Sequence, residues 1–347
     1  MTIPPGPPPY GYGYPPPPPP PKPGVIPLAP LGFSAILTGA FATIGRYWKQ
    51  LLGVAATAYL GALVVVAAAI GIAYAAVGDT LPAVFDLPEG QEPPWDDLRP
   101  LIVAFVCVWL VGMIAMLCAG ALVAAACPAV VQEAVLGRPT TFGAIWRRSW
   151  SRMPAVFGTV FLTSLALMVP FALFAAAFIG LFVVLLGTGD RTYVLPLVMI
   201  LGALLLIPLA LWIWVKFSLA PAAAVIEGRG AVDSMRRSSQ LVRGDWWRVF
   251  GCVLAAGVLA SVVGMLIQQV LSMLASTPLA ATDFSGEDSA AVVASLALVL
   301  TFLVLGQLVT QAIVSVFPPL VTALLYVDQR IRRENLAPDL ARAAGAL

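Results

Sequence analysis

The sequence has no histidine and very little charge. Lys, Arg, Asp and Glu together make up 10% of its 347 residues, whereas a soluble domain carries about 25%. Without histidine, the chain has no imidazole for acid–base catalysis or metal ligation. Its four cysteines form no Cys-x-x-Cys pair, and we interpret them as reduced, small hydrophobic residues. We therefore expect a non-enzymatic protein that holds no cofactor.

The sequence instead contains long runs of apolar residues. Hydrophobic residues make up 60% of the chain, and several runs are long enough to cross a bilayer as a helix. The runs are continuous rather than alternating, which favours helices over a β-barrel. We predict an all-α integral membrane protein with six transmembrane helices, at about 51–77, 101–136, 151–186, 193–226, 245–275 and 290–327.

The charges divide unevenly between the two sides that these spans create. All of the 19 basic residues except Arg99 and Arg191 fall on the side of both termini. The other side carries ten of the 17 acidic residues. An excess of Lys and Arg marks the cytoplasmic side of a membrane protein. We therefore predict a multi-pass protein of the bacterial cell membrane with both termini in the cytoplasm.

The spans fall into three similar units, at about 31–137, 138–228 and 229–330. Each unit is predicted to contain a cytoplasmic amphipathic interfacial helix, an outward span, a loop and an inward span. Proline recurs near the cytoplasmic end of each inward span, as Pro128, Pro221 and Pro318-Pro319. The fold class is thus six helices arranged as three hairpin repeats.

Two tails flank this membrane domain of residues 31–330. Residues 1–30 are half proline, with tyrosines set among glycines, which predicts a disordered or polyproline II cytoplasmic tail. A solvated tail and a docking segment for an unidentified protein partner both fit that composition. Residues 331–347 are expected to form a short cytoplasmic C-terminal tail.

Arginine and tryptophan alternate in two segments that precede outward spans. Arginine near the cytoplasmic surface attracts anionic lipid, and tryptophan prefers the depth of the headgroups. Because the basic residues are spread among short loops beside the membrane, nucleic acid is not an expected partner. The predicted contacts with anionic headgroups are Arg147, Arg148, Arg152, Arg236, Arg237, Arg243, Trp246, Trp247 and Arg248.

A second candidate site consists of the few polar residues within the spans, namely Gln307, Gln311 and Lys216. Gln307 and Gln311 lie one helical turn apart, so they either bond a neighbouring helix or line a path for a polar substrate. Lys216 lies close to the cytoplasmic end of its span, where a lysine can extend its ammonium group to the interface.

Three segments resemble a bacterial membrane-protein family labelled glycerophosphoryl diester phosphodiesterase membrane domain. They are Pro23–Gly32, Leu219–Gly228 and Arg236–Arg248, the last with the sequence Arg-Arg-Ser-Ser-Gln-Leu-Val-Arg-Gly-Asp-Trp-Trp-Arg. The family's label comes from fusions to a soluble phosphodiesterase that uses histidines and metal-binding carboxylates. This chain has no histidine, so the resemblance implies a membrane domain without the catalytic one.

Two functions fit the sequence. The first is a non-enzymatic scaffold or accessory component of the cell membrane, because the spans carry almost no charge. The alternative is a transporter-like protein that accommodates a lipidic or small apolar molecule, which the prolines within the spans favour.

Overall fold

The computed structural model describes residues 23–81, 84, 94–188, 194–280 and 289–343, and these residues form only helices and connecting turns. Six of the helices are long and apolar enough to cross a membrane, which indicates a multi-pass membrane protein. The elements are α1 (Phe33–Val77), η1 (Gly78–Thr80), α3 (Trp95–Val135), α4 (Phe142–Thr188), α5 (Val194–Phe217), α6 (Ala220–Ile226), α7 (Ala231–Val242), α8 (Trp246–Ala280), α9 (Ser289–Val314), α10 (Phe317–Glu334) and α11 (Ala337–Ala343).

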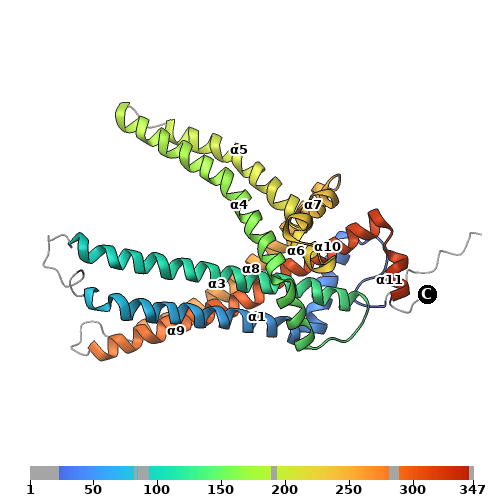
Figure 1. Cartoon of the computed structure of the whole chain (residues 1–347), viewed down its shortest axis with the longest axis horizontal. Helices are drawn as coiled ribbons and strands as arrows, with labels where there is room; N and C mark the ends of the chain where they lie inside the picture. The colour runs from blue at the N-terminus through green and yellow to red at the C-terminus, as the bar shows by residue number, and fades with distance from the viewer. Residues whose placement is uncertain (1–22, 82–83, 85–93, 189–193, 281–288, 344–347) are drawn as a thin grey trace, which may run out of the picture.

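The long helices pair as neighbours in the chain. α1 packs along α3, α4 along α5, and α8 along α9, while α9 also contacts α1. Figure 1 shows the four helices α1, α3, α8 and α9 running together, whereas the α4–α5 pair leans away from them. The short helices α6, α7, α10 and α11 gather at the end where these pairs converge.

The buried core lies at this convergent end. Buried residues of α3 occur only from Ala119 onwards, and those of α1 only up to Ala62. Towards the other end the helices expose large apolar side chains such as Ile72 and Phe105. Those side chains suit contact with lipid. The molecule therefore combines a tightly packed convergent end, here called the hub, with pairs of apolar helices that are long enough to cross a membrane.

Two of the predicted continuous spans, at 193–226 and 290–327, are each broken into two helices in the structure. α5 ends at Phe217 and α9 at Val314, each four residues before a proline. A proline has no N–H for the carbonyl four residues earlier, and its ring clashes with that carbonyl. The chain then restarts as α6 and α10, with Pro221 and Pro318 in their first turns.

Ser238 of α7 holds the break between α5 and α6 together. Its hydroxyl donates to the carbonyl of Lys216 at 2.8 Å and accepts from the N–H of Leu219 at 3.3 Å. Ser238 is fully buried, so without it both backbone groups would lose their partner in a dry environment. At the other break, between α9 and α10, the thiol of Cys127 in α3 lies 3.5 Å from the carbonyl of Val316.

The structure corrects the predicted extent of the N-terminal tail. Residues 1–22 lie outside the described residues, but Ile26, Leu28 and Leu31 are buried. The N–H of Val25 bonds the carbonyl of Ala134 at 3.0 Å, and a side chain at Gly24 would overlap that carbonyl. Residues 23–32 are therefore a packed segment that crosses the hub, and only the part before residue 23 remains a predicted tail.

The boundary between the first expected surface helix and the first span corresponds to a kink in α1. The non-helical backbone of Tyr47 (φ −120°, ψ 23°) divides α1 close to residue 51, where the span was predicted to begin.

The corresponding boundary in α4 differs from the prediction. α4 continues through Pro154, where we expected a new helix to begin near Ser151. In the predicted C-terminal tail, residues 331–334 end α10 and α11 follows after Asn335 and Leu336.

Candidate functional site

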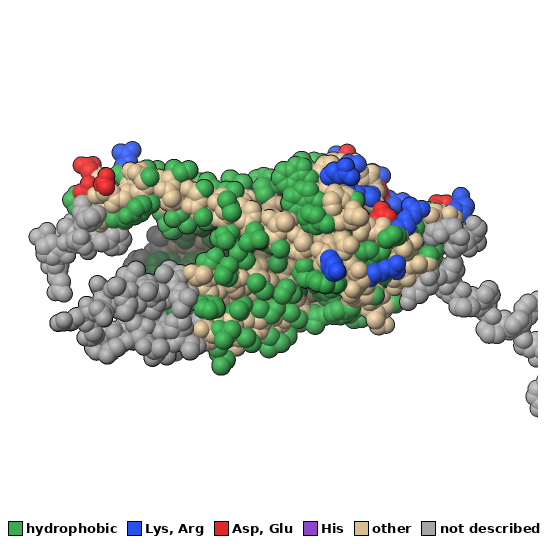
Figure 2. All heavy atoms as spheres, turned by 90° about the horizontal axis from the view of Figure 1, so that it is seen from below, with side chains coloured by type: hydrophobic (Ala, Val, Ile, Leu, Met, Phe, Trp, Pro, Cys, Tyr) green, Lys and Arg blue, Asp and Glu red, His purple; other side chains and the backbone are tan. Residues whose placement is uncertain are grey.

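Charge separates to the two ends of the molecule (Figure 2). Lys and Arg side chains gather at the hub, whereas the far end shows acidic side chains and a single basic patch. The described charges at that far end are Asp79, Asp96, Asp97 and Arg99. The ion pairs between described residues lie at the hub rather than at the far end.

A cluster around Glu227 joins three helices there. Its carboxylate pairs with Arg237 of α7 at 2.9 Å, with Arg229 at 2.5 Å and with Arg330 of α10 at 3.6 Å. The hydroxyl of Tyr326 also donates to it. Arg237 extends the cluster to Glu334, so a carboxylate following α6 binds α7 and α10 together.

This environment moves the pKa of both central groups. Burial by itself raises the pKa of Glu227, but hydrogen bonds from Tyr326 and Arg237 and the charges of Arg237 and Arg330 outweigh it, so the pKa lies below its ordinary value. Burial lowers the pKa of Arg237, but its hydrogen bonds to Glu227 and Glu334 raise it above normal. Both groups are therefore held in their charged forms.

A second cluster surrounds Asp328, whose side chain is fully buried. Arg248 of α8 pairs with it at 2.7 Å and Arg332 at 3.1 Å. The N–H of Leu31 donates to the same carboxylate at 2.7 Å, and the Leu31 carbonyl accepts from both arginines. Asp328 thus fastens the N-terminal segment to α8 and α10.

These contacts give several of the predicted headgroup residues an internal role. Arg237 and Arg248 are mostly buried in the two clusters. Arg148 bonds Gln132 and pairs with Glu133 at 3.6 Å, and Arg152 donates to the carbonyl of Gly228 at 3.1 Å. These arginines already bind other parts of the chain, so they are weaker candidates for binding lipid headgroups than the sequence indicated.

Several cations at the hub have no acidic partner among the described residues, and two of them line the same pocket. Lys216 of α5 and Arg243, which follows α7, border a cavity of about 410 Å³ with Ser239. The indoles of Trp212 and Trp246 complete its polar and aromatic wall. No acidic residue lines this cavity, so the Lys216–Arg243 pocket, as we name it, presents net positive charge.

Donors prevail in the Lys216–Arg243 pocket. The ammonium of Lys216 lies 4.3 Å from the ring centre of Trp212, which supports it through a cation–π contact. The indole N–H of Trp246 is buried and has no partner in the described part of the chain. A buried donor without a partner costs about 1–3 kcal/mol, and an anion that reached this N–H would offset that cost.

The structure unites residues from both predicted sites. Arg243 and Trp246 came from the predicted headgroup contacts and Lys216 from the predicted intramembrane group, yet the three share one pocket. Gln307 and Gln311 belong to α9, which packs on α8, α1 and α10 rather than on α5. Gln307 is exposed and Gln311 half-buried, so they form no common site with Lys216.

The remaining predicted headgroup residues lie on the surface of the hub. Trp247 is 77% exposed, and Arg147 is exposed with no bond to another described residue. Arg236 is exposed and makes a long 3.9 Å pair with Asp233. For these three the predicted contact with headgroups remains a prediction.

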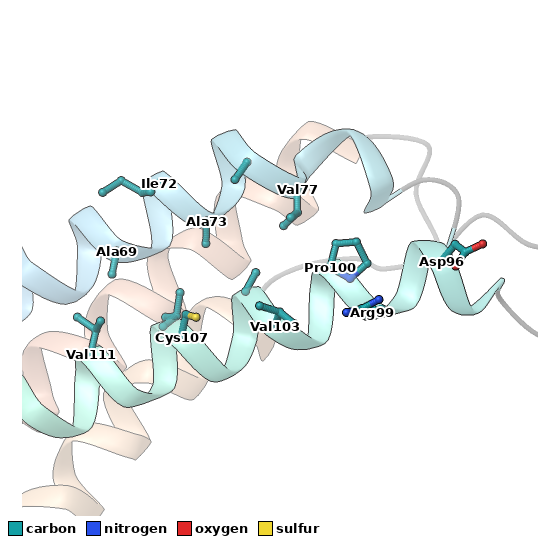
Figure 3. Close-up of a pocket in the computed structure, with 13 residues that line it drawn as sticks. Ala69, Ile72, Ala73, Val77, Asp96, Arg99, Pro100, Val103, Cys107 and Val111 are labelled. Carbon is teal, nitrogen blue, oxygen red and sulfur yellow. The ribbon is translucent and has the colours of Figure 1, made fainter.

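The far end holds an apolar pocket of another kind (Figure 3). It has a volume of about 680 Å³ and lies between α1 and α3, with Ile72, Val103 and Cys107 among its walls. Asp96 and Arg99 sit at its end, beside the start of α3. The described residues that line this pocket come from these two helices, and its apolar walls suit contact with lipid chains.

Throughout the described chain, Cys, Asp and Glu side chains form no group of three or more that could hold a metal ion.

Sequence reasoning missed Asp328, Tyr326 and Ser238, which organise the hub. One signal was present, because Asp328 and Arg332, like Arg330 and Glu334, are spaced for an ion pair on one face of a helix. The tertiary partners had no such signal, since Leu31 and Asp328 are 297 residues apart in the chain.

Comparison with known proteins gives a family but no characterised relative. A family model described as Domain of unknown function (DUF7847) matches residues 50–328. No curated protein and no solved structure matches the chain.

Proposed function

Because the chain belongs to the DUF7847 family, a domain of unknown function, we propose a role from the geometry of its own hub. The protein is a non-enzymatic accessory component of the cell membrane that captures the phosphate of an anionic lipid. The Lys216–Arg243 pocket carries this proposal, because its two cations lack acidic partners while neighbouring arginines are paired.

The chemistry of the pocket suits a lipid phosphate. Each cation near a membrane surface contributes about 1 kcal/mol to the attraction of anionic lipid. Phosphate oxygens accept strong hydrogen bonds from ammonium and guanidinium groups, which Lys216 and Arg243 supply to the pocket. The indoles of Trp212 and Trp246 are suited to the depth of the headgroups, where a lipid would present its phosphate.

The finer architecture is part of the same proposal. Three hairpin repeats would lie in the bacterial cell membrane with both termini and the hub in the cytoplasm. The gathering of Lys and Arg at the hub supports this orientation, because such an excess marks the cytoplasmic side. The recurrence of Pro128, Pro221 and Pro318 near the hub end of the inward helices supports the repeat. The expected surface helices, of which α7 is one, would lie in the interface beneath the headgroups.

Lipid retention by the purified protein tests the proposal. The full chain would be exchanged into detergent with phosphatidylglycerol or phosphatidylcholine, and bound lipid counted by native mass spectrometry. We expect preferential retention of phosphatidylglycerol, reduced about tenfold or more in Lys216→Gln/Arg243→Gln, since two cations are lost.

A charge-matched variant provides the control. Lys49→Gln/Arg342→Gln removes one lysine and one arginine that are exposed, lie outside the pocket and are not among the predicted headgroup contacts. It should retain phosphatidylglycerol as the unmodified protein does. Equal losses in both double variants would show a diffuse effect of net charge and would contradict a site at Lys216 and Arg243.

A further inference from the structure

A further cavity lies where the proline-bearing segments of the three predicted inward spans meet. Its volume is about 320 Å³, and its walls come from α3, α4, α5, α6, α8 and α10. Pro128, Pro221, Pro318 and Pro319 all line it. It shares no lining residue with the Lys216–Arg243 pocket, so the two are separate sites.

Hydroxyl groups supply most of the polar side-chain atoms of this central cavity. Four of them donate their only proton to a carbonyl of their own helix or its end, so only their acceptor lone pairs remain for a ligand. These are Thr159 to Val156 at 2.7 Å, Thr163 to Thr159 at 2.7 Å, Ser218 to Val215 at 2.8 Å and Thr322 to Pro319 at 3.1 Å.

The prolines add backbone acceptors to the same walls. Ala124 and Phe217 line the cavity, and each lies four residues before a proline, at Pro128 and Pro221. A helical carbonyl in that position has no N–H to accept from. Among the lining side chains, only Trp214 and Ser164 keep an N–H or O–H that no described bond uses. Acceptors therefore exceed donors.

The other walls are apolar and no charged residue lines them. Leu167, Val160 and Val253 are examples, and the cavity has no Lys, Arg, Asp or Glu. Ser164 of α4 is exposed at its edge, on the helix pair that leans away from the rest of the bundle (Figure 1). A ligand can thus approach along α4 from the lipid.

We propose that the central cavity binds an apolar molecule whose head donates hydrogen bonds, such as the hydroxyl of a long-chain alcohol or the ammonium of a long-chain amine. The apolar body would contact the aliphatic walls, and the donor would reach the hydroxyl oxygens and the freed carbonyls. This ligand class is distinct from the anionic headgroup of the Lys216–Arg243 pocket, whose polar groups are donors. The inference does not rest on the proposed function.

Photolabelling in nanodiscs tests this assignment. The full chain in phosphatidylcholine nanodiscs would be irradiated with dodecanol, dodecylamine or dodecyl methyl ether, each carrying the same diazirine. The ether keeps the oxygen but has no donor. We expect the alcohol or the amine to label peptides containing Thr163 or Thr322 about threefold or more above the ether, as one hydrogen bond allows. The probe that labels more strongly, alcohol or amine, identifies the head group that the cavity prefers.

Variants then assign the contact to the cavity. Thr163→Val/Thr322→Val keeps the side-chain shape and should lower labelling to the level of the ether. Thr310→Val is the control, because Thr310 makes a similar 2.9 Å bond to Gly306 but does not line the cavity. Equal labelling by all three probes on the unmodified protein, or labelling concentrated outside the cavity, would overturn the proposal without any variant.

Discussion

Three arginines that were predicted to contact headgroups differ in their partners in the structure. The sequence places Arg237, Arg243 and Arg248 in one basic segment, and all three were predicted to face headgroups. In the structure Arg237 and Arg248 pair with carboxylates, and only Arg243 lacks one. Arg237 pairs with Glu227, 10 residues away, and with Glu334, 97 residues away, whereas Asp328 lies 80 residues from Arg248. The distant partners have no local signal in the sequence.

Glu227 should be the most sensitive single carboxylate at the hub. Glu227→Gln removes one of the two carboxylates that pair with both Arg237 and Arg330, and Glu334 is the other. Removing one partner of a buried ion pair costs about 3–5 kcal/mol when the remaining charge is uncompensated. Because Glu334 compensates in part, we expect a smaller but clear fall in the thermal midpoint in dodecyl maltoside. Glu133→Gln, which breaks one half-exposed 3.6 Å pair, should shift the midpoint far less.

The depressed pKa of Glu227 predicts how stability depends on acid. A carboxyl whose folded-state pKa is below its ordinary value of 4.5 stabilises the fold fully above that pH. This contribution is lost as the pH falls through the folded-state pKa. Thermal midpoints measured from pH 7 to pH 3 should therefore decline below about pH 4.5. The decline should be shallower in Glu227→Gln, and identical slopes in both proteins would count against the assignment.

Helix elements show which structural features follow from pattern alone. The six spans were predictable because apolar length is a strong local signal. The interruption between α7 and α8 at Gly244 was also predictable, because glycine readily adopts a positive φ. Its φ in the structure is +98°. The breaks after Phe217 and Val314 were not, because proline alone does not decide between a kink and a break. α3 continues through Pro128, whereas α5 and α9 stop.

Adjacent serines allow a sharp test of the α5–α6 break. Ser238→Ala removes the hydroxyl that bonds Lys216 and Leu219, leaving a buried carbonyl and N–H unpaired. We expect a loss of about 2 kcal/mol in stability, measured as a lower thermal midpoint. Ser239→Ala removes an exposed hydroxyl that bonds only Arg236 within its own helix, and it should be nearly neutral. Similar shifts for both would show that Ser238 does not join the two helices.

The N-terminal segment tests the second ion cluster. In Asp328→Asn, the N–H of Leu31 and the guanidinium of Arg248 lose their shared carboxylate. Hydrogen exchange should then quicken about tenfold across residues 23–32, because that segment opens more easily. Asp339→Asn alters only an exposed pair with Arg342 and serves as the control. Unchanged exchange in Asp328→Asn would mean that apolar burial alone holds the segment.

At the scale of the whole molecule, the structure divides into a polar hub and apolar hairpins. Uneven charge along the sequence predicted this polarity, and the described Lys and Arg side chains do gather at one end. The meeting of Lys216, Arg243 and Trp246 was not predictable, because it depends on how α5, α7 and α8 converge. The central claim is that this convergence leaves two cations free for a lipid phosphate.

A structure of the full chain in nanodiscs that contain phosphatidylglycerol tests that claim most directly. We expect phosphate density between the ammonium of Lys216 and the guanidinium of Arg243. A pocket free of lipid density, with Lys216 and Arg243 instead paired to acidic side chains of the chain, would contradict it.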